Sequence, residues 1–374
     1  MSSIETNQNY NGKSVLLSFE NKRATDFTSV ENVCAQCASR GYYFDKISRV
    51  AFDNSEEIVR AIKECVSHYE NIFLLYPSQM DITLKGFVAD LLGCAFDGLG
   101  ILQSGKISVF ALFSDSANRL NFDDIKRALD GKYNVAYDRM VIRTVCAPYN
   151  LLEEAIGVAK GVLQSEKANG EAFVNVTESF GDCRIEIIYT DTTPKMIVDG
   201  AVREIVKRLN GYIYAMDDTP LAEQLFRLLQ LRRMRISVAE SFTGGGICKR
   251  LVDVPGISEV FFEGLNTYSN QAKTERLGVR ENTLRQYGAV SAETAREMAE
   301  GLLRSGNCEI AVATTGIAGP KSDNTRKPVG LAYIAVGSAH RDVLVYQFNF
   351  VGNRENIAQT AINQALFLAY KELK

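Results

Sequence analysis

Between residues 13 and 160, apolar runs about the length of one strand alternate with stretches that have the periodicity of amphipathic helices. The apolar runs lie at 14–18, 72–76 and 107–112, and the helical stretches lie near 29–39, 58–65 and 84–92. Alternation of this kind is typical of a sheet whose strands are parallel and are joined by helices. The sequence therefore predicts an α/β fold with a parallel sheet for a first domain, at residues 1–165.

Two further domains are predicted after a polar stretch at 164–171, which has the composition of a linker or a long loop. Residues 166–217 contain an alternating strand (183–189), a helix (196–209) and a short strand (212–214), as expected for a small α+β module. Residues 218–374 begin a new α/β pattern. Its helices are predicted at 221–232, 246–251, after 291 and at 355–372, and its strands at 234–238, 309–313, 331–336 and 343–350.

Composition excludes several classes of protein. The 374 residues are 46% apolar and carry a formal charge of -3, so no general basic field indicates nucleic acid or an anionic membrane as a partner. The first eleven residues lack a signal-peptide pattern and no run of about 18 apolar residues occurs, so we expect a cytoplasmic protein. Only His68 and His340 are present, and Cys34 and Cys37 fit the apolar stripe of a helix, so we expect no bound metal or cofactor.

The segment Ala239–Gly246 (AESFTGGG) is the first candidate for chemistry, because it follows an apolar run and precedes a helical stretch. Ser241 and Thr243 would then lie at a strand-to-helix turn, where free backbone amides and the positive end of the helix dipole favour anions. The glycines Gly244 and Gly245 would let a ligand approach those amides closely. The alternative is that Ser241 and Thr243 are only an ordinary helix cap.

Three more segments place small, polar or glycine residues where an α/β sheet exposes its strand ends, namely 268–273, 314–320 and 352–354. The amides of Gly316, Ala318 and Gly319 could stabilise an oxyanion or bind a phosphate. Arg354 could add a bidentate contact to that phosphate. The alternatives are a tight turn before Pro320 and a surface ion pair between Arg354 and Glu355.

The scarcity of histidine favours a lysine as the base for a serine nucleophile. At its ordinary pKa of about 10.4, Lys273 would be neutral in only about one molecule in two thousand at pH 7, but burial can lower a lysine pKa by about 3 units. A neutral Lys273 could take the proton of Ser241 while Tyr268 relays the proton or orients the amine, which would support acyl transfer. The alternative is a solvated surface lysine.

These segments carry a resemblance to a known family. Residues 219–374 resemble the C-terminal domain of the CinA (competence/damage-inducible protein) family, the nicotinamide mononucleotide deamidases, whose ordered motifs are AESCTGG, YSNxAK, GAVS, GIAGP and KPVG. The corresponding sequences here are AESFTGG (239–245), YSNQAK (268–273), GAVS (288–291), GIAGP (316–320) and KPVG (327–330). Two departures are Phe242 in place of the usual cysteine and residues 321–325 in place of a glycine pair.

The resemblance implies hydrolysis of nicotinamide mononucleotide to nicotinate mononucleotide and ammonia without a metal. By motif position it implies Ser241 as nucleophile, Lys273 as base and Tyr268 as the assisting residue. It also implies Thr315 as an active-site threonine and Arg354 as a substrate contact. The family forms dimers or larger assemblies, so the resemblance implies a homo-oligomer whose ligand is a small nucleotide, with neither nucleic acid nor membrane as a partner.

The front of the chain resembles the rest of that family only in architecture. The family order is a molybdopterin-binding-like domain, a KH-like module and the deamidase domain. The motifs GTELL and TGGLGPTxDD, linked to metal-dependent ADP-ribose pyrophosphatase activity, are absent here, and only Asp81 lies near the second. We expect a degenerate first domain without catalysis. Alternatives for the whole chain are a non-catalytic nucleotide-binding scaffold and, less favoured by the missing motifs, an ADP-ribose pyrophosphatase.

Overall fold

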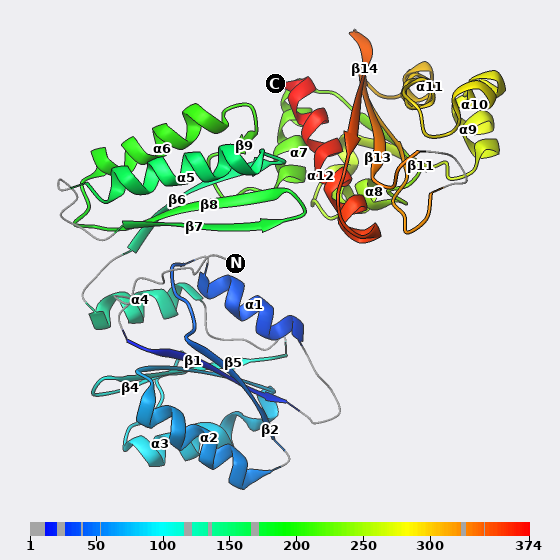
Figure 1. The fold of residues 1–374 in the computed structure, drawn as a ribbon. Coiled ribbons are helices and arrows are strands. Elements are labelled where there is room, and N and C mark those ends of the chain that lie inside the picture. Colours follow the sequence, from blue (N-terminus) through cyan, green and yellow to red (C-terminus); the bar gives the residue numbers. More distant parts are fainter. Residues whose placement is uncertain are drawn as a thin grey trace. The chain divides into compact units, whose positions relative to one another are not determined.

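A computed structural model of the chain describes residues 12–20, 27–38, 40–52, 54–115, 122–133, 137–165, 172–322, 327–339 and 341–374 (Figure 1). The chain divides into two compact units. One consists of Met1–Arg139 with Tyr189–Thr192, and the other of Met140–Ile188 with Thr193–Lys374. Within the described ranges, no helix has both the length and the apolar character needed to cross a membrane.

The first unit contains the parallel sheet that the sequence predicts. Its strands are β1 (Ser14–Glu20), β2 (Lys46–Ala51), β3 (Asn71–Tyr76), β4 (Ile101–Ser104) and β5 (Ile107–Phe113), in the order β2-β1-β3-β5-β4. All neighbours pair in parallel except β4 and β5. The helices are α1 (Phe27–Ala38), α2 (Ser55–His68), a 3-10 turn (Ser78–Met80), α3 (Asp81–Leu92) and α4 (Phe122–Tyr133).

Helices cover both faces of this first sheet, because alternate residues of its buried strands point to opposite sides. Val15, Leu17 and Leu74 belong to the apolar cluster that includes residues of α2 and α3. Leu16 and Phe73 belong to the second cluster, with residues of α1 and α4. The result is a three-layer α/β arrangement, which confirms the predicted fold class for this part of the chain.

A second sheet of four strands follows, in the order β7-β8-β6-β9. Its elements are β6 (Tyr137–Val145), α5 (Tyr149–Leu163), β7 (Ala172–Ser179), β8 (Asp182–Thr190), α6 (Lys195–Leu209) and β9 (Ile213–Ala215). β6 lies between β8 and β9, so this sheet includes a strand from before the predicted boundary at residue 165. α5, which follows β6, also precedes that boundary. The pairing of β6 therefore places the start of the second sheet earlier than the polar stretch 164–171, of which 166–171 lie outside the described residues.

The C-terminal sheet has the strand order β11-β10-β12-β13-β14. Its strands are β10 (Ile236–Glu240), β11 (Phe261–Asn266), β12 (Ile310–Gly316), β13 (Leu331–Ser338) and β14 (Arg341–Asn349). β10, β11 and β12 are parallel, whereas β13 and β14 are antiparallel to their neighbours. The helices are α7 (Leu221–Arg232), α8 (Gly246–Val252), a 3-10 turn (Ile257–Glu259), α9 (Asn270–Leu277), α10 (Glu281–Tyr287), α11 (Ala292–Arg304) and α12 (Arg354–Leu373).

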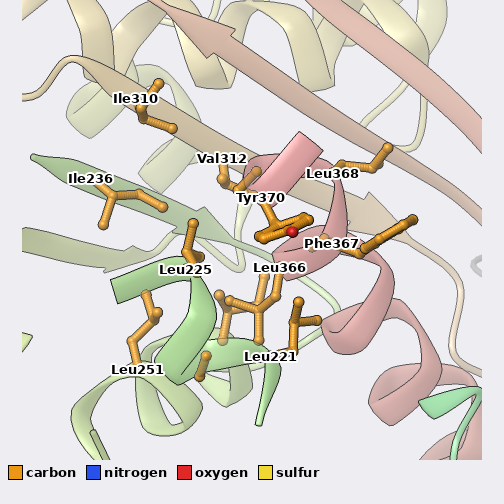
Figure 2. Close-up of a cluster of buried hydrophobic side chains, with 14 of the residues drawn as sticks. Leu221, Leu225, Ile236, Leu251, Ile310, Val312, Leu366, Phe367, Leu368 and Tyr370 are labelled. Carbon is orange, nitrogen blue, oxygen red and sulfur yellow. The ribbon is translucent and has the colours of Figure 1, made fainter. Parts of the chain in front are cut away.

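The core of this domain lies on both faces of the C-terminal sheet. Figure 2 shows the cluster on one face, where side chains of α7, α8 and α12 pack against Ile236, Ile310 and Val312. Val145 and Tyr214 of the second sheet belong to the same cluster, so the second sheet and the C-terminal domain share a core. α11 packs on the opposite face. This two-sided packing fixes the carboxyl ends of β10, β11 and β12 side by side.

Candidate active site

The turn that carries Ser241 leads directly from β10 into α8. Gly244 and Gly245 have φ angles of 64° and 96°, in the left-handed region that residues with a Cβ adopt only at a cost. Two successive left-handed residues reverse the chain within a few positions, so the helix starts at Gly246. The glycines are therefore needed for the shape of this turn, which presents Ser241 at the end of the strand.

Ser241 and Lys273 lie in hydrogen-bond contact. The Lys273 Nζ is 3.0 Å from the Ser241 Oγ, and it also donates to the carbonyl oxygens of Thr267 at 2.7 Å and Tyr268 at 3.2 Å. Lys273 is 1% exposed and Ser241 is 8% exposed. The two carbonyls hold two of the amine protons, so the third position on the nitrogen faces the serine hydroxyl. In the neutral amine that position is the lone pair.

Burial lowers the pKa of Lys273 to about 8, because removal of the ammonium from water disfavours its charged form. A lysine with that pKa is neutral in about one molecule in ten at pH 7. The pair therefore combines a nucleophile with a base that is unprotonated in a useful fraction of molecules near neutral pH.

Two alternatives are wrong, namely that Ser241 and Thr243 are only a helix cap and that Lys273 is a solvated surface lysine. The N-cap residue of α8 is Gly245, and neither Ser241 nor Thr243 caps that helix with its side chain. The Ser241 hydroxyl contacts Lys273, while the Thr243 Oγ1 lies 2.8 Å from the Thr314 Oγ1. Lys273 is buried, so it is not a solvated surface lysine.

The sequence predicts unpaired N–H groups at residues 243–246, and this is wrong for the amides of Gly244, Gly245 and Gly246. The amide of Gly244 donates to the Ser241 carbonyl at 3.2 Å and that of Gly246 to the Thr243 carbonyl at 3.0 Å. The Gly245 amide donates to the carboxylate of Glu240 at 3.1 Å. The amides of Phe242 and Thr243 donate to no acceptor among the described residues. Those two amides are the next in sequence after Ser241.

Tyr268 contributes its backbone rather than its hydroxyl to the pair. Its carbonyl accepts a bond from Lys273, whereas its side chain is 65% exposed. The sequence assigned Tyr268 an orienting or relaying role. In the described part of the chain, no hydrogen bond joins its phenol to Ser241 or Lys273. The orienting role thus belongs to the carbonyl in this geometry, and the Tyr268 ring is exposed.

Thr315 and Lys327 hold the GAVS segment (288–291). The Thr315 hydroxyl donates to the Ala289 carbonyl at 2.7 Å, and Thr315 is 1% exposed. The Lys327 Nζ donates to the carbonyls of Tyr287 at 2.8 Å and Val290 at 2.6 Å. Three sequence motifs therefore meet in one network. From the sequence, Lys327 is recognisable only as part of the KPVG motif, because nothing in the local sequence indicates its contact with the GAVS backbone.

Phe242 points into the core. It is 6% exposed and packs in a cluster with Ala318, Ala332, Ile357 and Ala361. Gly316 makes room for the ring, because a Cβ on that residue would lie 3.0 Å from the Phe242 Cδ1. The phenylalanine therefore does not obstruct the Ser241 turn, and the glycine of the GIAGP motif is part of its packing site.

Arg354 lies at the first turn of α12 and contacts the GIAGP loop. Its Nη1 donates to the Gly319 carbonyl at 2.7 Å, and no ion pair with Glu355 is present among the described residues. The amides of Ala318 and Gly319 have no acceptor in the described structure. Arg354, Ala318 and Gly319 thus offer donors at one place. Residues 323–326 of the following loop lie outside the described residues.

Residues 218–373 match the family model described as the CinA C-terminal domain. A competence-damage inducible protein of Caldicellulosiruptor saccharolyticus is 43% identical over 183 residues, covering 49% of this chain and 44% of that protein. The corresponding protein of Clostridium beijerinckii is 45% identical over 161 residues, covering 43% of this chain and 39% of that protein. The chain thus spans less than half the length of these relatives.

Among solved structures, the competence/damage inducible protein CihA from Agrobacterium tumefaciens is 38% identical, with a TM-score of 0.39 over 40% of this chain and 90% of that one. The family-model match at residues 218–373 contains Ser241, Lys273 and Arg354. Residues 218–373 are a CinA C-terminal domain, and the resemblance of the chain to the CinA family rests on this part.

Proposed function

We propose that the C-terminal domain is an amidohydrolase that converts nicotinamide mononucleotide to nicotinate mononucleotide and ammonia. The observation that carries this proposal is the 3.0 Å contact between the Ser241 Oγ and the Nζ of a fully buried Lys273. A serine beside a buried lysine is an arrangement for acyl transfer, because the neutral amine can accept the serine proton as the oxygen attacks a carbonyl. The substrate itself is assigned by family resemblance.

The reaction has two halves, in both of which Lys273 moves the proton. The Ser241 Oγ attacks the carboxamide carbon while its proton passes to Lys273, which gives a tetrahedral oxyanion. Collapse of that intermediate breaks the C–N bond, and Lys273 returns the proton to the departing nitrogen, so ammonia leaves and an ester remains on Ser241. Water then attacks the ester by the same proton route, which releases the carboxylate and restores the serine.

Backbone amides are the donors that we assign to the oxyanion and to the nucleotide. The amides of Phe242 and Thr243 lie on the turn of the nucleophile and have no acceptor in the described structure. Donors that are fixed before the reaction stabilise developing charge effectively, because they need not reorganise. We assign the amides of Ala318 and Gly319, together with Arg354, to the phosphate. We assign Thr243, Gly244, Gly245, Thr315 and Gly316 to the segments that adjoin these donors.

Activity is expected to rise with pH through the titration of Lys273. The base must be neutral, so kcat/KM should increase about tenfold per pH unit below a midpoint of about 8 and level off above it. Measurement of kcat/KM for ammonia release between pH 6 and pH 10 tests this. A profile that is flat or falls between pH 7 and pH 8 would contradict the assignment of the base.

Replacement of Arg354 by alanine is expected to raise KM for nicotinamide mononucleotide by about 10- to 100-fold, with kcat changed little. A hydrogen bond to a charged group contributes roughly 1.5–3 kcal/mol, and the phosphate does not take part in the bond changes. Steady-state kinetics gives both constants. Nicotinamide riboside, which lacks the phosphate, is the matched control, because its KM should be the same for wild type and variant. An equal rise for both substrates would remove Arg354 from the phosphate site.

For the first unit we propose that no metal-dependent pyrophosphatase activity remains. Asp81, the acidic residue nearest to the missing motif, accepts a bond from the Tyr76 hydroxyl at 2.7 Å and pairs with Lys85 at 2.9 Å. The described residues contain no cluster of three or more side chains suited to a metal ion. The residues present therefore do not fit a bound cation at this place. ADP-ribose with added divalent metal should be stable in the presence of the full chain.

A further inference from the structure

We propose that the side chain of Glu240 is a positioning residue that holds the Ser241 turn in its reactive shape by accepting hydrogen bonds from the first amides of α8. This inference rests on the proposed function and adds a residue to it. Glu240 is the last residue of β10, directly before the nucleophile, and it is 0% exposed. A buried carboxylate persists only where donors replace the water it has lost.

Those donors are three backbone amides. The Glu240 Oε2 accepts from Gly245 at 3.1 Å and from Ile247 at 3.1 Å, and its Oε1 accepts from Cys248 at 2.9 Å. The first amides of a helix have no partner inside the helix, and α8 has no side-chain cap of its own. Glu240 therefore does the work of a cap from the strand that precedes the turn, and its negative charge lies at the positive end of the helix.

The thiol of Cys248 belongs to the same contact. Burial and the neighbouring Glu240 carboxylate together raise the pKa of the Cys248 thiol above its usual value, so the thiol stays neutral near pH 7. A neutral thiol next to the carboxylate is a donor and not a competing anion. The groups around the Glu240 oxygens are thus donors, which fixes the carboxylate in one orientation.

The backbone of Glu240 also joins the turn to the base. Its carbonyl accepts from the Thr267 amide at 2.8 Å, and the Thr267 carbonyl accepts from Lys273 at 2.7 Å. The Glu240 carbonyl is therefore bonded to Thr267, just after β11 and before Lys273 in the sequence. The Glu240 carboxylate is bonded to the start of α8, which follows Ser241. Residues 241–244 lie between these two attachments, so Ser241 cannot shift relative to Lys273 without breaking one of them.

The carboxylate also decides which amides face the substrate. Its bonds use the amides of Gly245, Ile247 and Cys248, and they leave those of Phe242 and Thr243 without an acceptor. A looser turn would let these two amides and the Ser241 Oγ move apart from the position of the reacting carbonyl. Misplacement of this kind lowers the rate of the chemical step and leaves substrate binding nearly unchanged, because the nucleotide contacts lie elsewhere.

Glu240→Gln is the test variant, with Glu297→Gln as the matched control. The glutamine keeps one acceptor oxygen, but its side-chain NH₂ group would face backbone N–H groups. Two donors cannot form a hydrogen bond with each other. We expect kcat to fall about 10- to 100-fold, with KM within about threefold of wild type and the pH midpoint unchanged. Glu297 is a carboxylate of the same domain, 6% exposed, that accepts from the Arg280 amide at 2.8 Å and the Thr283 hydroxyl at 2.7 Å. Its variant should keep kcat within about threefold.

Hydrogen exchange on the wild-type protein tests the contact without any assay of activity. The amides of 245, 247 and 248 should exchange at least tenfold more slowly than those of 242 and 243, although all lie at or before the first turn of a helix. In Glu240→Gln the three protected amides should exchange at least tenfold faster. This measurement holds even if the variant folds poorly or the wild type releases no ammonia, so it separates the two proposals.

Three results would overturn the role of Glu240. The first is rapid exchange of the amides of 245, 247 and 248 in the wild-type protein, which would mean that the carboxylate does not hold them. The second is a Glu240→Gln variant with faster exchange at these positions and wild-type kcat, which would mean that the bonds form but do not serve the reaction. The third is a fall in kcat equal to that of Glu297→Gln, which would mean that the effect is not specific to Glu240.

Discussion

Replacement of Ser241 by alanine is expected to lower kcat for ammonia release from nicotinamide mononucleotide by roughly 10⁴- to 10⁶-fold. The alanine removes the only atom that forms the ester in the proposed reaction, and water would have to attack the carboxamide without a covalent route. The effect on folding should be small, because the Ser241 hydroxyl bonds only Lys273 among the described residues. Steady-state kinetics with an ammonia assay measures the change.

Two controls make the Ser241→Ala result specific. Ser305→Ala removes a hydroxyl that bonds the Leu302 carbonyl at 2.8 Å at the end of α11, so it tests the loss of a serine away from the site. Its kcat should equal that of wild type. The Ser241→Ala protein should still be stabilised against heat by the nucleotide, because the proposed nucleotide contacts are unchanged. Activity within tenfold of wild type in Ser241→Ala would rule out the serine as nucleophile.

Replacement of Lys273 by methionine is expected to lower kcat by about 10²- to 10⁴-fold, which is the usual contribution of a positioned general base. Methionine has a similar length and no titratable group, so the proton of Ser241 loses its acceptor. The rise of kcat/KM around pH 8 should disappear with it. Lys249→Met on α8 is the matched control, because that lysine is exposed and pairs with Asp253 on the surface. It should keep wild-type kinetics.

Lys273→Met should lower activity without lowering the free energy of unfolding near neutral pH. The pKa of Lys273 is about 8 in the folded protein and 10.5 in the unfolded chain. The unfolded state therefore binds more protons between these values, and the free energy of unfolding rises with pH from about 8 to 10.5, by roughly 3 kcal/mol. Lys273→Met lacks this rise. Below pH 8 its free energy of unfolding should equal or exceed that of wild type, whereas a clear loss of stability would indicate a structural role for the amine.

Several buried strands and amphipathic helices were predictable from sequence, whereas the edge strands β2 and β11 were not. α7 (Leu221–Arg232) and α12 (Arg354–Leu373) lie close to the predicted ranges, because each has a strong apolar pattern between recognisable ends. β2 (Lys46–Ala51) and β11 (Phe261–Asn266) have no such pattern. They lie at the edges of their sheets and most of their residues are partly or fully exposed. An edge strand can form from backbone pairing alone, so composition does not reveal it.

The chemistry-bearing residues of the site could be identified from the sequence, but their contacts could not. Ser241 and Lys273 are 32 residues apart, and the parallel pairing of β10 with β11 is what brings them to 3.0 Å. The sequence placed the free amides at residues 243–246, whereas Glu240 and nearby carbonyls accept from those of Gly244, Gly245 and Gly246. That error arose because the reach of the Glu240 side chain depends on the shape of the turn. The orientation of Phe242 likewise depends on Gly316, in a strand that follows much later.

The most direct test of the proposed function is the stoichiometry of products formed from nicotinamide mononucleotide by the full chain. We expect one ammonia for each nicotinate mononucleotide with wild type, and formation of both products about 10²- to 10⁴-fold more slowly with Lys273→Met under the same conditions. Thermal stabilisation by the nucleotide without release of ammonia would contradict the account. That outcome would instead favour a protein that binds the nucleotide as a scaffold and does not turn it over.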